Sequence, residues 1–166
     1  SVLKNKERGD LLIRKENLEK KLYRILPKLK PRLVTMEEVA KSIPKDGILI
    51  EFQRYTAFAS AKSKNEEGKK HYIALVLNPN GTKSAINLGT ADLVDRKIIE
   101  ALKATEEGLV NVQQLWKEVG ELVIKPLKES IGDAQTLFIS PDAELNRIPF
   151  AALSSYKDNQ LLGDVI

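Results

Sequence analysis

The stretch from residue 136 to residue 153 constrains the fold of this chain more than any other. After Thr136 it has three apolar residues at 137–139, and Ser140, Pro141 and Asp142 follow directly. Pro141 has no amide proton to give to a sheet, so a buried strand should end there and a turn should begin. After the turn, apolar residues return at Leu145, Ile148, Phe150 and Leu153. This pattern predicts a central strand of an α/β sheet, in which function usually lies at the carboxyl ends of the strands.

Two helices are predicted near the start of the chain, the first of them from its apolar periodicity. Residues with the spacing of one helix face are Leu11, Leu18, Leu22 and Ile25. We expect a helix over residues 10–26, after a short lead-in that ends at Gly9, which is a weak helix former. Thr35 and Glu38 form a capping box, which predicts a short helix over residues 36–42.

Three apolar or alternating runs predict strands over residues 48–55, 71–77 and 83–88. Asn80 and Gly81 are the expected turn pair of a hairpin between the second and third strands. The polar segment at 57–69 is expected to be a mobile loop.

Two amphipathic helices are expected after the third strand. The first starts at Thr90 and ends near Ala104, and its predicted buried residues are Leu93, Val94, Ile98, Ile99 and Leu102. The second runs over residues 112–130 with Asn111 as its cap, and Pro126 predicts a kink or a restart within it. This order of elements predicts an α/β fold: a mixed sheet flanked by helices, with an amino-terminal helical extension.

The last residues, 159–166, have the pattern of a turn followed by the start of a strand. A strand that has only begun is a poor place for a domain to end. We therefore expect the chain to be part of a longer protein.

Composition and charge exclude several classes of function. The net charge of +4 is mild, and 23 acidic residues are interspersed among 27 basic ones, so a nucleic-acid partner is not expected. The sequence has no cysteine, which excludes disulfides, thiolate metal sites and a cysteine nucleophile within it. Without a spanning apolar run or a signal-peptide pattern, we expect a cytoplasmic protein with no membrane partner.

His71 is the only histidine, so any mechanism that needs a histidine base must use it. It stands at the entry of a predicted strand, and we interpret it as a surface residue. Asp142 and Glu144 are the best candidates for an acid–base pair, because they follow the end of a buried strand. The alternative, which we favour, is that Asp142 forms the turn by accepting hydrogen bonds from backbone amides two residues on.

Other kinds of site find little support. Asp92 and Asp95 lie at a helix start, and the helix dipole explains them better than metal binding. Glycine-rich phosphate loops are absent from the sequence. Near Arg54 stand three aromatic residues, Phe52, Tyr55 and Phe58. They are more typical of the core and rim of a strand than of base stacking. We predict no catalytic, cofactor-binding or metal-binding residue in this chain, and no cofactor.

The stretch at 137–153 closely resembles the signature of CHAT domains, caspase-like domains that commonly follow TPR repeats. Other segments resemble further parts of the family in the same order, at residues 46–55, 72–81, 86–89, 116–127 and 161–164. The resemblance covers residues 33–166, the amino-terminal part of such a domain, and residues 1–32 then resemble a helical connector from a TPR array. One departure is Ala143, where the family often has glycine. Alanine disfavours a positive φ, so we expect a less strained turn there.

CHAT domains resemble the caspase and separase class of cysteine peptidases, which implies an α/β/α sandwich with a His–Cys dyad downstream of the 137–153 motif. This chain ends before both dyad residues, and His71 does not correspond to the family histidine. The resemblance therefore implies a non-catalytic part of a cysteine endopeptidase. Its partners would be the remaining half of the domain and TPR repeats or another protein. The alternative is an interaction or regulatory module that presents the helix at 10–29 and the loop at 57–69.

Overall fold

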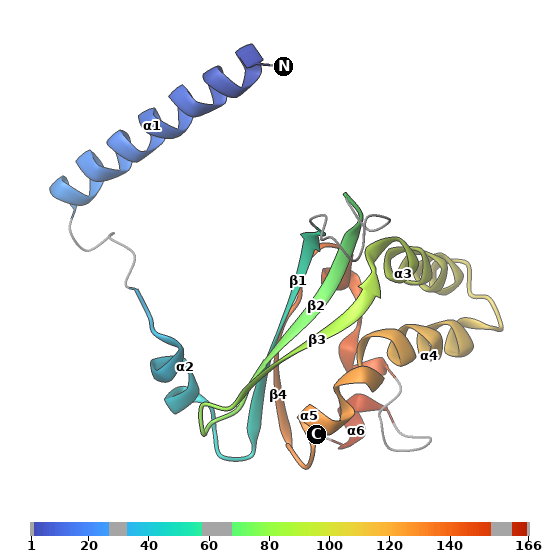
Figure 1. The fold of residues 1–166 in the computed structure, drawn as a ribbon. Helices are drawn as coiled ribbons and strands as arrows, with labels where there is room; N and C mark the ends of the chain where they lie inside the picture. The colour runs from blue at the N-terminus through green and yellow to red at the C-terminus, as the bar shows by residue number, and fades with distance from the viewer. Residues whose placement is uncertain (1, 27–32, 58–67, 154–160, 166) are drawn as a thin grey trace, which may run out of the picture. The chain divides into compact units, whose positions relative to one another are not determined.

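The computed structural model describes residues 2–26, 33–57, 68–153 and 161–165, and the chain divides into two units (Figure 1). The first unit, Ser1–Thr35, contains helix α1, Val2–Ile25. The predicted lead-in is wrong, because α1 continues through Gly9. Good helix formers surround this glycine and outweigh its cost of about 1 kcal/mol. The large apolar side chains described in α1 and just after it are exposed, namely Leu11, Leu12, Ile13, Leu18, Leu22, Ile25 and Leu26.

The second unit, Met36–Ile166, is built on a four-stranded sheet with the strand order β3-β2-β1-β4. The strands are β1 (Gly47–Thr56), β2 (Lys70–Leu77), β3 (Lys83–Thr90) and β4 (Thr136–Ser140). β2 pairs antiparallel with β1 and β3, whereas β4 pairs parallel with β1, so the predicted mixed sheet is confirmed. The prediction of a central strand at 137–139 is wrong, because β4 is at the edge of the described sheet and β1 lies inside it.

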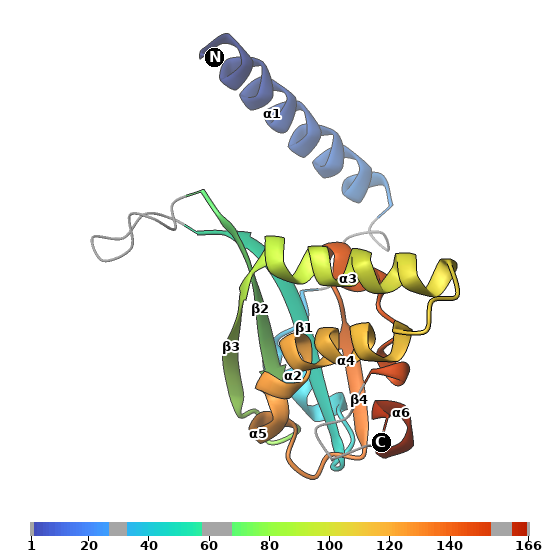
Figure 2. The same cartoon turned by 90° about the vertical axis from the view of Figure 1, so that its right-hand side faces the viewer.

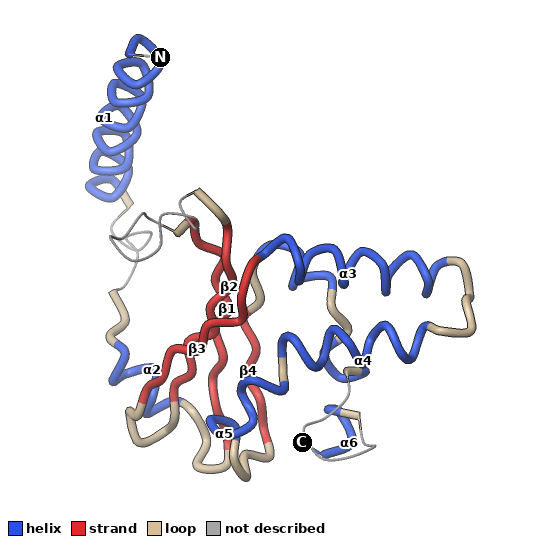
Figure 3. The backbone as a smooth tube through the Cα atoms, turned by 45° about the vertical axis from the view of Figure 1, so that its right-hand side comes forward, coloured by secondary structure: helices blue, strands red, loops and turns tan. Residues whose placement is uncertain are grey.

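Helices lie on both faces of this sheet (Figures 2 and 3). One face carries α3 (Ala91–Glu106), α4 (Val112–Val123), a 3-10 turn η3 (Lys125–Leu127) and α5 (Lys128–Ile131). The other face carries α2 (Met36–Ser42), whose bounds match the prediction. Strands and helices thus pack together in one unit, and the α/β fold is established.

The long helix predicted over 112–130 restarts where Pro126 was expected to interrupt it. α4 ends at Val123, and α5 begins after the 3-10 turn that contains Pro126. Asn111 precedes α4 as predicted, but its side chain makes no capping hydrogen bond.

After β4 the chain forms three short helical segments: η4 (Ala143–Arg147), η5 (Phe150–Ala152) and α6 (Leu162–Val165). The strand start predicted within 159–166 is wrong. Leu161 makes only an isolated bridge, and Leu162 begins a helical turn in which its own side chain is buried. Most of the polar loop predicted at 57–69 lies outside the described residues.

The core lies between the sheet and α3, α4, η3 and α5. It takes every second residue of the strands and the inward residues of the helices, including Ile48, Ile50, Phe52, Tyr72, Ala74, Val76, Val94, Ile98, Val119, Val123 and Leu127. The apolar residues that return after the turn form a plug in this core, as expected: Leu145, Ile148 and Leu153 are buried in the same cluster, and Phe150 packs against it. Leu93 and Ile99 were predicted to be buried but are 37% and 50% exposed. They lie on the margins of the α3 face that Val94 and Ile98 define.

The opposite face of the sheet carries a groove of about 460 Å³ beside α2. Met36 and Val39 of α2 line one side, and aliphatic residues of the strands line its floor. The floor residues are Leu49, Leu75, Leu77 and Ala85, with Glu51 and Lys83 also lining the groove. This face is therefore apolar, but less completely covered than the face that carries α3 and α4.

Two adjacent isoleucines of α3 test this description of the core. Ile98 is 0% exposed and Ile99 is 50% exposed. We expect Ile98→Ala to lower the free energy of unfolding by about 2–5 kcal/mol, because it empties a packed site. Ile99→Ala should change it by no more than about 0.5 kcal/mol. Urea denaturation of both variants measures the difference, and equal effects would contradict the orientation of α3.

Candidate functional site

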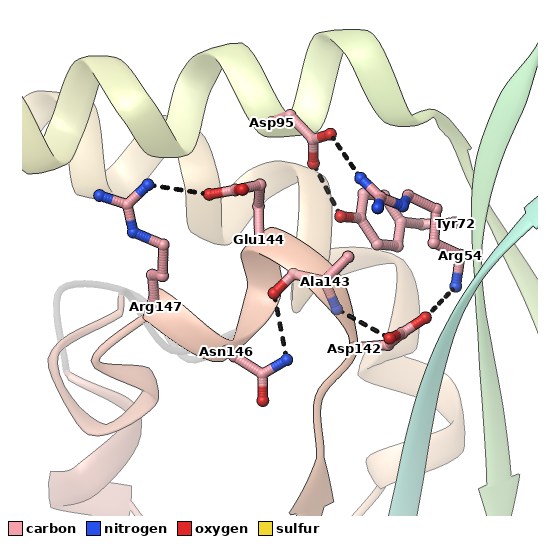
Figure 4. Close-up of polar contacts among 8 residues, drawn as sticks. All are labelled: Arg54, Tyr72, Asp95, Asp142, Ala143, Glu144, Asn146 and Arg147. Atoms are coloured by element: carbon pink, nitrogen blue, oxygen red, sulfur yellow. Dashed lines mark hydrogen bonds and ion pairs between the residues drawn. The ribbon is translucent and has the colours of Figure 1, made fainter.

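The motif at 137–153 forms a turn that a single carboxylate holds in place (Figure 4). Asp142 follows β4 and caps η4, and its side chain lies beside β1. Asp142 Oδ1 accepts a hydrogen bond of 2.8 Å from the backbone N–H of Ala143, and Asp142 Oδ2 accepts one of 2.8 Å from the backbone N–H of Arg54. The favoured structural role of Asp142 fits these contacts, although its partners are not the amides two residues on.

The bond to Arg54 replaces a strand partner. The parallel pairing of β1 and β4 ends at Glu51 and Ser140, whereas β1 continues to Thr56. The Arg54 N–H lies beyond the last residue of β4, and an unpaired backbone N–H at a sheet edge needs an acceptor. Asp142 supplies this acceptor from the turn that follows β4.

Ala143 has a φ of 51°, and it is the one described non-glycine residue with a positive φ. The prediction of a less strained turn at this position is wrong. Left-handed backbone costs an alanine roughly 1–2 kcal/mol, because its Cβ approaches the following carbonyl oxygen. Two hydrogen bonds hold this conformation: the N–H donates to Asp142, and the carbonyl oxygen accepts from Asn146 Nδ2 at 3.1 Å.

A second carboxylate, Asp95 of α3, joins the helical layer to the sheet. The Tyr72 hydroxyl donates to Asp95 Oδ1 at 2.7 Å, and Arg54 Nη1 lies 3.4 Å from Asp95 Oδ2. Tyr72 is 0% exposed, so its hydroxyl needs a partner inside the protein. The prediction that the helix dipole explains Asp95 missed this role. One Asp95 side chain links α3 to both β1 and β2.

The pKa of Tyr72 lies well above its ordinary value. Burial of the phenol is the largest cause, and the hydrogen bond to Asp95 and the negative charge of Asp95 act in the same direction. The nearby Glu144 backbone and the positive charge of Arg54 act in the opposite direction. The hydroxyl therefore stays protonated and donates to Asp95.

Asp142 and Glu144, the candidates for an acid–base pair, are each engaged by other groups. Glu144 Oε2 accepts from Arg147 Nη1 at 2.9 Å, while Asp142 is occupied by two backbone amides. A cysteine nucleophile is also excluded, since the sequence contains no cysteine. The arrangement joins backbone segments to one another and offers no complete set of groups for acyl transfer.

His71 lies at the start of β2, where it is opposite Tyr55, and the two ring centroids are 5.8 Å apart. The prediction of a surface histidine is wrong, because His71 is 8% exposed. Adjacent strand residues face opposite sides of a sheet. His71 therefore faces away from Tyr72 and from the cluster that Tyr72 forms with Arg54 and Asp95.

Within the described ranges, we found no group of three or more His, Cys, Asp or Glu side chains that could hold a metal ion. Among those same residues, no helix is long and apolar enough to cross a membrane. Comparison with protein-family models gave no match, and comparison with curated protein sequences gave none.

Replacing Ala143 with glycine should stabilise the protein. Glycine adopts a positive φ without the Cβ contact, so Ala143→Gly should raise the free energy of unfolding by about 1 kcal/mol. The corresponding rise in Tm is about 2–4 °C for a chain of this size.

The control for this variant is Ala152→Gly at an exposed position of η5, where φ is not positive. It should lower stability by about 0.5–1 kcal/mol, because glycine loses more backbone entropy on folding. Thermal unfolding followed by circular dichroism measures both. A loss of stability in both variants would contradict a strained Ala143.

Tyr72 should remain protonated at a pH where an unfolded tyrosine ionises, about pH 10. Because its folded pKa is raised, its contribution to stability is complete below that pH and is lost as the pH rises towards the folded pKa. Tyrosinate absorbance should therefore rise equally in the parent protein and in Tyr72→Phe until the fold opens. An additional ionisation in the parent before unfolding would contradict the buried bond to Asp95.

Proposed function

We propose that this chain is the amino-terminal, non-catalytic part of a CHAT-domain, caspase-like cysteine endopeptidase. It would build one part of an α/β/α sandwich and support a catalytic part that carries the histidine and the cysteine. The observation that carries the proposal is the structure of the motif at 137–153. This motif is the most specific point of resemblance to the family, and it forms a strand, a turn held by Asp142 and an apolar plug.

The contacts of this motif favour a supporting role. Asp142, the most conspicuous carboxylate of the motif, binds two backbone N–H groups, one of them on β1. Leu145 and Leu153 of the plug are 0% exposed. Groups used in this way position a sheet and are not free to act on a substrate. A sequence without cysteine leaves the nucleophile of such an enzyme to another part of the protein.

The edge of the sheet fits the same role. β4 is five residues long and pairs with β1, and in the described sheet its other edge has no strand beside it. An open strand edge presents backbone N–H and C=O groups that can pair with a further strand. Parallel strands are also generally covered on both faces. Phe138 of β4 is 42% exposed on the face opposite α3 and α4. We propose that the catalytic half of the domain continues the sheet at β4, in a cytoplasmic protein.

A second candidate function is a protein-interaction or regulatory module without peptidase activity. The observation that favours it is the exposure of the leucines of α1, where Leu18 is 58% and Leu22 is 45% exposed. Apolar side chains spaced along one helix are the usual anchors of a helix that binds a groove in a partner. TPR repeats or another helical protein would be the partner.

The test compares peptidase activity of the 166-residue chain with that of the same chain extended by the residues encoded after Ile166. We expect no thiol-dependent cleavage of a peptide library by the shorter chain. The extended protein should cleave, and changing its cysteine to alanine should abolish the cleavage, because the thiolate is the nucleophile.

Two results would contradict the peptidase proposal. The first is cleavage by the 166-residue chain that disappears in His71→Ala. The second is an extension without a histidine-glycine pair and a later cysteine. If that extended protein instead bound a helical-repeat protein through Leu18 and Leu22, the interaction module would be the better description.

A further inference from the structure

The tip of the β2–β3 hairpin combines an asparagine, a glycine and a hydrogen bond in an arrangement that favours chemical change. Asn80 and Gly81 are both exposed. The backbone N–H of Thr82 donates to Asn80 Oδ1 at 2.8 Å. Gly81 has a φ of 83°, and a Cβ built on it would meet no atom within 4 Å. Gly81 therefore has no side chain, and the space where its Cβ would stand is open, so no side chain hinders the approach of its nitrogen to Asn80.

We propose that Asn80 is a site of spontaneous deamidation in the folded protein, and that the isoaspartate product loosens the β2–β3 hairpin. The inference is independent of the function proposed above. It concerns a covalent change that needs only water and the atoms of the hairpin itself.

Deamidation uses only the atoms of Asn80 and Gly81 and one water molecule. The Gly81 nitrogen loses its proton and attacks Asn80 Cγ, so that an N–Cγ bond forms and the Cγ–Nδ2 bond breaks. Nδ2 leaves as ammonia and takes up a proton, and a five-membered succinimide remains. Water then adds to one of the two ring carbonyls. Opening on one side gives aspartate, and opening on the other gives isoaspartate, in which the main chain runs through the former side chain.

Two hydrogen bonds act on the rate in opposite directions. Negative charge develops on Asn80 Oδ1 during the attack, and the Thr82 N–H already donates to that atom. A donor aimed at a developing oxyanion stabilises the transition state. The Gly81 N–H donates to the Asn78 carbonyl oxygen at 2.9 Å, and this bond must break before attack. The net free energy of a backbone hydrogen bond is smaller than that of a hydrogen bond to a charged atom. The stabilisation of the transition state by the Thr82 N–H is therefore larger than the cost of breaking the Gly81 hydrogen bond.

The isoaspartate product would disturb the hairpin because it adds a methylene group to the main chain and moves the carboxylate away from Thr82. Three hydrogen bonds depend on the present geometry of this turn: Thr82 N–H to Asn80 Oδ1, Asn78 N–H to the Thr82 carbonyl, and Gly81 N–H to the Asn78 carbonyl. The next pair of the ladder joins Leu77 and Lys83, which also line the groove beside α2. Loosening would therefore reach one end of that groove.

The chain supplies its own matched controls. Asn78 lies on the same hairpin but precedes Pro79, whose nitrogen has no proton and cannot close the ring. Asn87 Oδ1 accepts from the Gly89 N–H at 2.9 Å, which is the same kind of hydrogen bond, but Asn87 precedes Leu88 inside β3. Asn87 therefore has the same acceptor contact as Asn80 but is not followed by an unhindered glycine.

The experiment incubates the full chain in warm, mildly alkaline buffer and follows each asparagine by peptide mass mapping. The readout is the mass change of an NH₂-to-OH exchange, with isoaspartate detected by methyltransferase labelling. We expect Asn80 to convert at least about tenfold faster than Asn87, a difference of about 1.4 kcal/mol in activation free energy, with Asn78 unchanged. Asn80→Asp should show no mass change at this site.

A parallel incubation in concentrated urea separates the effect of the turn from that of the dipeptide. Faster conversion in the folded chain is expected. Conversion of Asn80 that is no faster than that of Asn87, or slower in the folded chain than in urea, would overturn the proposed site.

Hydrogen exchange of the aged protein tests the second half of the proposal. The Asn78 and Thr82 amides should exchange faster than in fresh protein, while the Arg54 amide keeps its protection. Fresh Asn80→Asp serves as the control for added charge alone. Unchanged exchange at Asn78 and Thr82 in fully converted protein would overturn the loosening of the hairpin.

Discussion

The difference in length between β1 and β4 is the constraint on which the candidate site depends. β4 stops at Ser140, but β1 continues past Glu51 to Thr56, so part of β1 has no strand on that side in the described sheet. An Asp142 carboxylate closes this gap by accepting from the Arg54 N–H, and the same side chain fixes the turn at Ala143. A charged acceptor gives stronger hydrogen bonds than a neutral one, which is what a left-handed alanine requires.

The second joint is the carboxylate of Asp95, which holds α3 against the strands. Tyr72 brings a hydroxyl to the inner face of the sheet, and Arg54 brings a positive charge from the neighbouring strand. Since Arg54 donates its backbone N–H to Asp142 and pairs its guanidinium with Asp95, the two carboxylates form one connected group around Arg54. Three parts of the chain that are distant in sequence, β1, α3 and the 137–153 motif, meet there.

Much of the fold could be predicted because local patterns determine it: period-two strands, the Asn80-Gly81 turn, and Pro126 inside a helix. The predictions were wrong where tertiary contacts determine the backbone conformation or the burial of a residue. Ala143 takes a positive φ because Asp142 and Asn146 hold it, and alanine alone gives no sign of this. His71 is buried on β2, a strand that lies inside the sheet, whereas its place at the entry of a strand suggested the surface. Asp95 could have been noticed, because it shares the inward face of α3 with Ala91, Val94 and Ile98.

The parallel pairing of β1 with β4 also bears on how the protein reaches its native state. The antiparallel pairs of β1, β2 and β3 join neighbouring strands, whereas Arg54 and Asp142 are separated by 88 residues. Closing a long loop costs entropy before its contacts can repay it, and non-local pairings slow folding. The three-stranded meander should therefore form before β4 docks. The motif that most clearly marks this chain in sequence would be among the last of its parts to find its place.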